Sequence, residues 1–119
     1  MRAMGEFPKI YLYVPAVDMR KQLPGLSVMI ADALGHDPFS GGLYMFRGRR
    51  RDLIKCVYWD KTGFAMWVKK LDRELFPWPR TASSDETIFL SSEQVALLLA
   101  GVDIWKIKKH KVLKYEKTI

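Results

Sequence analysis

The sequence predicts a single α+β domain in which two helices pack against an antiparallel meander sheet of four or five strands. Two patterns support this fold class. Short runs rich in β-branched and aromatic residues alternate with turn-forming residues, as strands do. Two other stretches repeat their apolar residues at helical spacing. Of the 119 residues, 49% are hydrophobic, which is enough to build one core.

The first strand is expected at residues 10–14 (IYLYV), immediately before Pro15. Three candidate strands then follow closely at 43–47, 53–59 and 64–70, and a last short one is expected at 87–90. The short Gly-containing turns between the middle three predict antiparallel pairing of neighbours. Both faces of these strands carry aromatic residues, so the pattern leaves open which face is buried.

Each helix has a start signal and an apolar stripe. Pro24 suits a first helical turn, and Gly35 is placed to end that helix after the stripe formed by Leu26, Met29, Ile30, Ala33 and Leu34. Ser91 and Gln94 have the spacing of a capping box. The second stripe follows them at Val95, Leu98, Leu99 and Val102.

Positive charge is concentrated in two segments. The net charge is +7, but residues 47–55 hold five basic residues and one acid, and residues 106–117 hold six lysines and one glutamate. The rest of the chain is therefore slightly acidic. We expect one domain at 1–105 and a basic, flexible tail at 106–119. Clustered basic charge is the footprint expected of nucleic-acid binding.

The first of these segments is an arginine turn between two apolar runs, FRGRRRDLIKCVYWD. It holds Arg47, Arg49, Arg50 and Arg51, with Lys55 on the outgoing strand. One interpretation is a solvated hairpin tip kept basic for solubility. The other is a phosphate-binding surface, because such a dense positive cluster repels itself unless it meets an anion.

Alternation along the strands places lysines beside tryptophans. Lys55 and Trp59 share one strand face, and Trp67 and Lys69 share a face of the next strand, which ends at Lys70. A lysine beside a tryptophan could hold a phosphate next to a stacked base. The same pattern also arises when lysine stems cover half-buried tryptophans.

No pattern indicates an enzyme, a metal site or a cofactor. Cys56 is the only cysteine and reads as a buried apolar residue, and the two histidines, His36 and His110, are not placed near it. Gly41-Gly42 lacks the Lys-Ser/Thr of a phosphate-binding loop. No apolar run is long enough to span a bilayer. We therefore expect a cytoplasmic protein without catalytic residues, metal or cofactor, and without a membrane partner.

An ordered set of short motifs resembles one family, the TnpB accessory proteins of bacterial insertion sequences of the IS sixty-six type. The resemblance covers about residues 8–105. The matching motifs are DMR at 18–20, Gly25-Leu26, DPFSG at 37–41, FRGRR at 46–50, Lys55, YWD at 58–60, Gly63-Phe64, Trp67, KKL at 69–71, Trp78-Pro79, Leu90-Ser91 and the LLLAGVD run ending at Asp103. The chain departs from the family pattern at Pro24, Pro77 and Ala100.

The resemblance implies a role in transposition, assisting a separate transposase that performs the strand chemistry. The residues that match the family's basic positions are Arg20, Arg47, Arg49, Arg50, Lys55, Lys69 and Lys70. With Arg51 of the turn, they are the predicted DNA-binding residues. The predicted partners are DNA, at the element ends or without sequence preference, and the transposase. The alternative hypothesis is a module that docks on the transposase without contacting DNA.

Overall fold

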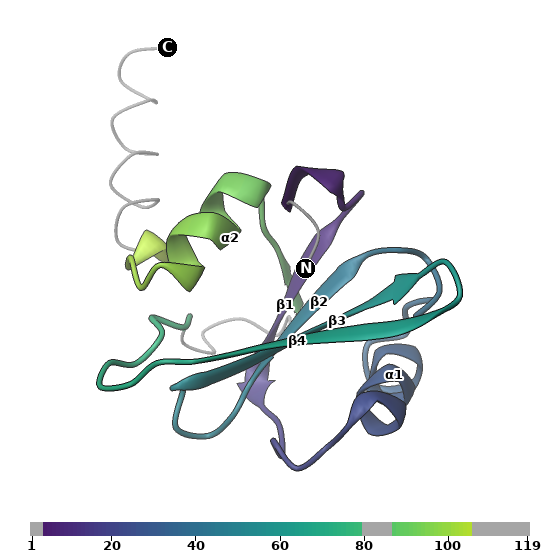
Figure 1. The fold of residues 1–119 in the computed structure, drawn as a ribbon, viewed down its shortest axis with the longest axis horizontal. Coiled ribbons are helices and arrows are strands. Elements are labelled where there is room, and N and C mark those ends of the chain that lie inside the picture. Colours follow the sequence, from purple (N-terminus) through teal and green to yellow (C-terminus); the bar gives the residue numbers. More distant parts are fainter. Residues whose placement is uncertain (1–3, 80–86, 106–119) are drawn as a thin grey trace.

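The computed structural model describes residues 4–79 and 87–105. The described strands are β1 (Ile10–Ala16), β2 (Leu43–Arg47), β3 (Leu53–Asp60), β4 (Gly63–Lys70) and β5 (Thr87–Phe89). The described helices are α1 (Leu23–Asp32), α2 (Ser92–Leu99) and a short 3-10 helix, η1 (Met4–Glu6). The five strands form one sheet in the order β4-β3-β2-β1-β5. α1 lies on one face of this sheet and α2 on the other (Figure 1).

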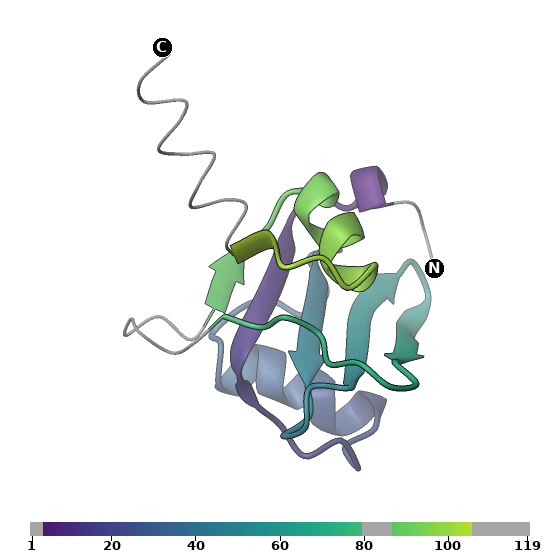
Figure 2. The same cartoon turned by 90° about the vertical axis from the view of Figure 1, so that its left-hand side faces the viewer.

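The sheet is mixed, which corrects the expected all-antiparallel meander. β1 and β2 are parallel neighbours, with Ile10 opposite Leu43 and Leu12 opposite Met45. The reason is the connection between them: α1 carries the chain back along the sheet, so β2 starts beside the start of β1. β2, β3 and β4 are antiparallel, as predicted, and β5 runs antiparallel to β1. Figure 2 shows the strands side by side between the two helices.

Both faces of the sheet are buried, which answers the question that the strand pattern left open. On β1, Leu12 and Val14 point into the core on the α2 side, whereas Tyr11 and Tyr13 point into the core beneath α1. The same alternation continues on β2 and β3. This is why the strands read as nearly continuous apolar runs instead of alternating apolar and polar residues.

The helix signals are confirmed. Leu26 and Ile30 of α1 are fully buried, and Gly35 just beyond its end has φ 68°, a left-handed conformation that glycine adopts without steric cost. At the start of α2, the Ser91 hydroxyl accepts from the Gln94 N–H at 3.1 Å, and the Gln94 side chain accepts from the Ser91 N–H at 2.9 Å. None of the helices in the described part could cross a membrane. The predicted tail at 106–119 lies outside the described residues.

Candidate nucleic-acid interface

Three connections meet at the end of the sheet where β2 finishes and β3 begins. They are the loop between β1 and α1, the turn between β2 and β3, and the segment that follows β4. Backbone hydrogen bonds join them: the Val17 N–H donates to the Arg47 carbonyl at 2.9 Å, and the Phe76 N–H donates to the Arg51 carbonyl at 2.8 Å. The β2–β3 turn therefore has neighbours on two sides that hold it in place.

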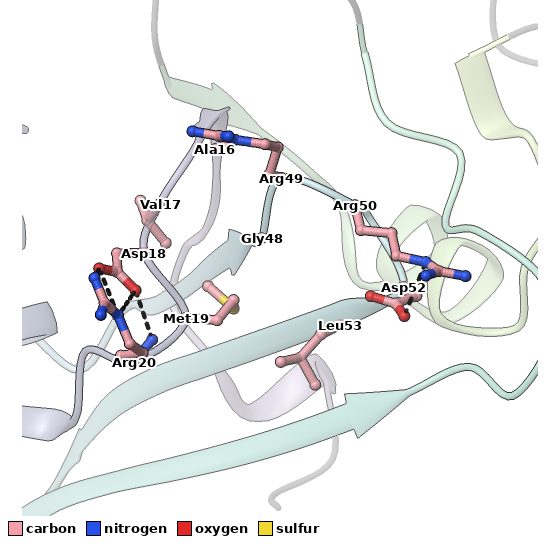
Figure 3. Close-up of a pocket in the computed structure, with 10 residues that line it drawn as sticks. All are labelled: Ala16, Val17, Asp18, Met19, Arg20, Gly48, Arg49, Arg50, Asp52 and Leu53. Carbon is pink, nitrogen blue, oxygen red and sulfur yellow. Dashed lines mark hydrogen bonds and ion pairs between the residues drawn. The ribbon is translucent and has the colours of Figure 1, made fainter.

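An open pocket of about 570 Å³ lies between the first two of these connections (Figure 3). It is lined by Ala16, Val17, Asp18, Met19, Arg20, Gly48, Arg49, Arg50, Asp52 and Leu53. Arginine and aspartate side chains from both connections surround it, so the lining carries both signs of charge. The strength with which this pocket could bind an anion depends on how tightly each arginine is already paired with an aspartate.

The turn that displays the arginines has an unusual backbone. The Gly48 N–H donates to the Leu53 carbonyl at 3.3 Å, and the Arg51 N–H donates to the Gly48 carbonyl at 3.2 Å, which closes the turn. Arg51 has φ 64°, in the left-handed region. That conformation costs a residue with a Cβ roughly 1–2 kcal/mol relative to glycine. The turn therefore carries an arginine at a position that glycine would occupy with less strain.

Gly48 allows the turn to approach the β1–α1 loop closely. A Cβ at this position would lie 2.6 Å from Cγ of Met19, which is closer than real Cβ atoms come to any neighbour. Gly48 is also buried. Its missing side chain is what lets Met19 pack on the turn, and Met19 immediately precedes Arg20. The two arginine-bearing connections are positioned against each other through this contact.

Arg49 and Arg50 are the most available cations of the turn. Both are exposed. Arg50 Nε lies 3.5 Å from Asp52 Oδ2, a long ion pair in which 83% of the arginine side chain remains accessible. Among the described residues, Arg49 has no ion pair. Exposed pairs of this kind contribute about 0–1 kcal/mol, so a phosphate could displace Asp52 at little cost.

Arg20 is held more tightly. Its Nε and Nη2 donate to both carboxylate oxygens of Asp18, at distances of 2.7–3.1 Å, and its backbone N–H donates to Oδ1 at 2.9 Å. The hydrogen bonds from Arg20 lower the pKa of the Asp18 carboxyl well below its usual range. Asp18 thus closes a tight turn before α1 and neutralises part of the charge of Arg20. The Arg20 side chain is still 92% exposed, so the outer edge of its guanidinium remains open to solvent.

Arg47 and Lys70 complete the group of basic residues at this end. Arg47 is half-buried; its Nε donates to the Val14 carbonyl at 3.1 Å, and burial, with Arg51 nearby, lowers its pKa. Lys70 is exposed at the end of β4, opposite Leu53. We call these basic residues the arginine surface: Arg20, Arg47, Arg49, Arg50, Arg51 and Lys70.

The two remaining predicted DNA-binding residues have internal partners and lie on opposite faces of the sheet. Lys55 is 6% exposed, and its Nζ donates to the carbonyls of Met19 at 2.7 Å and Lys21 at 2.9 Å. Lys69 Nζ donates to the Leu99 carbonyl, at the carboxyl end of α2, at 2.8 Å. A cation at a helix carboxyl end satisfies free carbonyls and opposes the helix dipole. The structure therefore does not place Lys55 on the surface that the arginines form.

The sequence reasoning missed two exposed basic residues near this end. Lys21 follows Arg20 in the same loop, and Arg73 follows β4, where its Nε lies 3.7 Å from Asp72. Their adjacency to predicted residues was the only signal available.

The described residues contain no group of three or more His, Cys, Asp or Glu side chains placed to hold a metal ion. Cys56 is fully buried, and desolvation raises the pKa of its thiol to about 12. Both findings concern only the part of the chain that the structure describes. The buried thiol matches its interpretation as an apolar residue of the core.

Comparison with known proteins gives the family. Residues 8–109 match the family described as "IS66 Orf2 like protein". The chain belongs to this family. Two proteins of Sinorhizobium fredii strain NGR234 are similar to it along most of their length. The protein named "Uncharacterized protein y4jC" is 33% identical over 104 residues, which is 87% of each chain.

The second relative, named "Uncharacterized protein y4hO", is 32% identical over 106 residues, covering 89% of this chain and 90% of its own. No solved structure matches the chain. The family is the one that the ordered motifs resembled, and the arginine surface lies inside the matched range.

Proposed function

We propose that this IS66 Orf2-like protein is a non-catalytic accessory factor of transposition. In this proposal it binds the DNA backbone with the arginine surface, in the bacterial cytoplasm, and assists a separate transposase. Membership of an insertion-sequence family supports the transposition part of the proposal. The gathering of exposed arginines at one end of the sheet supports the DNA-binding part.

The observation that carries the proposal is that the β2–β3 turn presents two exposed and weakly paired arginines. Arg51 is kept at φ 64°, and Arg49 and Arg50 project from the same turn without a strong partner. Strained backbone persists where the surrounding structure holds it, and it is found at binding sites more often than elsewhere. The left-handed conformation alone does not single out this turn, because Lys61 in the β3–β4 turn also has a positive φ, 55°. The exposed arginines of the β2–β3 turn do.

Guanidinium groups suit this task because they bind phosphate oxygens through two parallel hydrogen bonds. Arg49 and Arg50 are expected to make the main contacts. Arg20 would contribute its outer edge while staying paired with Asp18. Lys55 would act indirectly, since its bonds to Met19 and Lys21 hold the loop that carries Arg20.

The test is the salt dependence of DNA binding by the double variant Arg49→Ala/Arg50→Ala. Each phosphate contact contributes a slope of about −0.9 to the logarithm of the binding constant against the logarithm of salt concentration. The double variant should therefore bind more weakly and lose about two units of slope. The measurement is titration of a duplex with protein at several salt concentrations.

The matched control removes two positive charges at the opposite end of the sheet. Lys9→Ala with Lys61→Gly does this, and glycine suits the φ of 55° at residue 61. This control should leave the slope nearly unchanged. An unchanged slope in the arginine variant, or an equal loss in the control, would remove the DNA-binding assignment to the arginine surface.

A second candidate function is docking on the transposase without DNA contact, and one observation favours it. Phe39 is 57% exposed and lies against Trp59 and Phe64, with ring centroids 4.9 Å and 5.4 Å away. Exposed aromatic clusters are typical of protein-binding hot spots. This cluster lies at the β3–β4 turn, at the opposite end of the sheet from the arginine surface.

The two functions are separated by the variant Phe39→Ala. If the aromatic cluster docks on the transposase, co-purification of the two proteins from nuclease-treated extract should be lost while the DNA salt slope is kept. Co-purification that survives Phe39→Ala but fails with Arg49→Ala/Arg50→Ala would instead place the protein contact on the arginine surface.

A further inference from the structure

β4 is an edge strand of the sheet that the described residues form, and it is longer than an average strand. It stands at one end of the sheet order and has eight residues, whereas β5 at the other end has three. In Figure 2 the β3–β4 hairpin forms one side of the sheet. Proteins usually shorten, bend or cover such edges, because the free backbone groups pair readily with another strand.

The backbone groups that face outward from β4 follow from its pairing with β3. The Leu71 N–H donates to the Asp52 carbonyl at 2.8 Å, which continues the β3–β4 ladder by one pair. Residues at every second position before Leu71 therefore also face β3. The intervening residues face away, and these are Phe64, Met66, Val68 and Lys70. Among the described residues no backbone partner pairs with them on that side.

We infer that the open edge of β4 pairs with β4 of a second copy of this chain, which joins the two sheets into one. The partner must be an extended strand, because only a strand satisfies a row of alternating N–H and C=O groups. β4 itself meets this need when it runs antiparallel about a two-fold axis.

One register uses all four outward-facing residues. With Trp67 on the two-fold axis, Met66 lies opposite Val68 of the second copy, and Phe64 lies opposite Lys70. On the other face, Ala65 lies opposite Lys69. No lysine faces a lysine, whereas parallel pairing in register would place Lys69 and Lys70 against their own copies. Val68, which is 45% exposed, would gain an apolar neighbour.

Such a dimer would place its two arginine surfaces far apart. The carboxyl end of β4 lies beside the arginine turn, since Lys70 pairs with Leu53. Antiparallel pairing therefore sends the two turns to opposite ends of the joined sheet, separated by at least the length of β4, about 27 Å. The dimer would then hold two DNA segments at once. This last step rests on the proposed function, and the pairing of the edges does not.

The test of the interface is the mass of the protein in solution, measured by light scattering across a concentration series. The wild type should be a dimer. Val68→Pro removes an N–H that faces outward, so it should keep the β3–β4 ladder and yield a monomer. Val68→Lys keeps the backbone but places a charge opposite Met66 and diagonal to the substituted lysine of the second copy, so it should also yield a monomer. Val68→Thr is the matched control and should remain a dimer.

A cross-link locates the contact. Cys56 is fully buried, so a cysteine introduced at Val68 is the reactive thiol of the folded protein. In the predicted register the two introduced cysteines are diagonal neighbours, within reach of a short bismaleimide. Val28→Cys, on the exposed side of α1, is the control and should not cross-link.

The outcomes separate this inference from the proposed function. A wild-type monomer at every concentration, or a dimer that persists in both disruptive variants, overturns the β4 interface. Protection of the β4 amides from hydrogen exchange only after transposase is added also overturns it, in favour of a transposase strand. A dimer that binds no duplex leaves the interface standing and removes the DNA-binding proposal. If the β4 interface and DNA binding are both correct, the wild-type dimer bound to one duplex on beads should capture a second duplex from solution. The monomeric variants should bind the first duplex but not capture the second.

Discussion

Lys55 carries its positive charge at a site that is only 6% exposed. Burying an ammonium group is unfavourable unless its donors are satisfied. The carbonyls of Met19 and Lys21 satisfy two of them, at 2.7 Å and 2.9 Å. These carbonyls belong to the part of the β1–α1 loop that follows the Val17–Arg47 hydrogen bond to β2. The lysine therefore anchors that loop to the sheet, which is a structural role that its charge alone did not predict.

Lys55→Met tests this role, because methionine keeps much of the apolar stem and removes the donor. Two loop carbonyls would lose a charged partner, so the free energy of unfolding should fall by about 1–3 kcal/mol. The salt slope of DNA binding should be unchanged, since no phosphate contact is lost. Urea denaturation and the salt titration measure the two quantities.

Lys70→Met is the matched control for that variant. Lys70 is exposed on the neighbouring strand and on the same face of the sheet. Its loss should change stability by less than about 0.5 kcal/mol, as for most surface substitutions, and should reduce the salt slope. The reverse pattern, with the slope reduced by Lys55→Met, would place Lys55 at the DNA after all.

At the scale of elements, the candidate site depends on how one turn and one loop pack. The β2–β3 turn and the β1–α1 loop are far apart in the sequence. They meet because β1 and β2 are parallel neighbours, so their carboxyl ends lie side by side at one end of the sheet. Gly48 and Met19 form the contact. A small change in this contact should therefore move Arg20 relative to the arginine turn.

Gly48→Ala should disturb that packing. The added Cβ would lie 2.6 Å from Cγ of Met19, so the loop must shift, and overpacking of this kind costs about 1–3 kcal/mol of stability. Met19→Ala removes the clashing atom. The double variant should therefore be more stable than the sum of the two single changes predicts, as measured by a double-mutant cycle in urea. Strict additivity would show that the two residues are not coupled.

At the scale of the whole molecule, one sheet separates two cores. Cys56 lies in the core on the α2 side, fully buried, with its thiol pKa raised to about 12 from an ordinary value of 9.0. Because the folded pKa is the higher one, the contribution of this group to stability is complete below pH 9 and declines as the pH rises toward 12.

The Cys56 thiol should therefore report global unfolding. At pH 8 it should react with a disulfide reagent only through opening of the core, at a rate that rises along the urea unfolding transition. An exposed thiol introduced by Val28→Cys should react at once under native conditions. Fast native reaction of Cys56 would show that the core on the α2 side opens locally instead of with the whole domain.

Short-range sequence patterns predicted much of this fold. The strand at 43–47 was placed at its observed bounds, and the capping box of Ser91 and Gln94 was read directly, because both depend on neighbouring residues. The arginine turn was equally visible. Lys55 and Lys69 were both predicted to bind DNA because they match basic positions of the family, yet the register puts them on opposite faces of the sheet. Strand register is a non-local property, so alternation within one strand could not supply it.

The sequence by itself determined the α+β class, where the two helices start, the family and the presence of a dense arginine turn. Periodicity, capping and composition encode these within short windows of the chain. Only the tertiary structure decided that β1 and β2 are parallel, that both sheet faces are buried, and that Lys55 is hydrogen-bonded to the β1–α1 loop. These features depend on contacts between segments that are distant in the sequence. The packing energy of such contacts cannot be derived from any one segment alone.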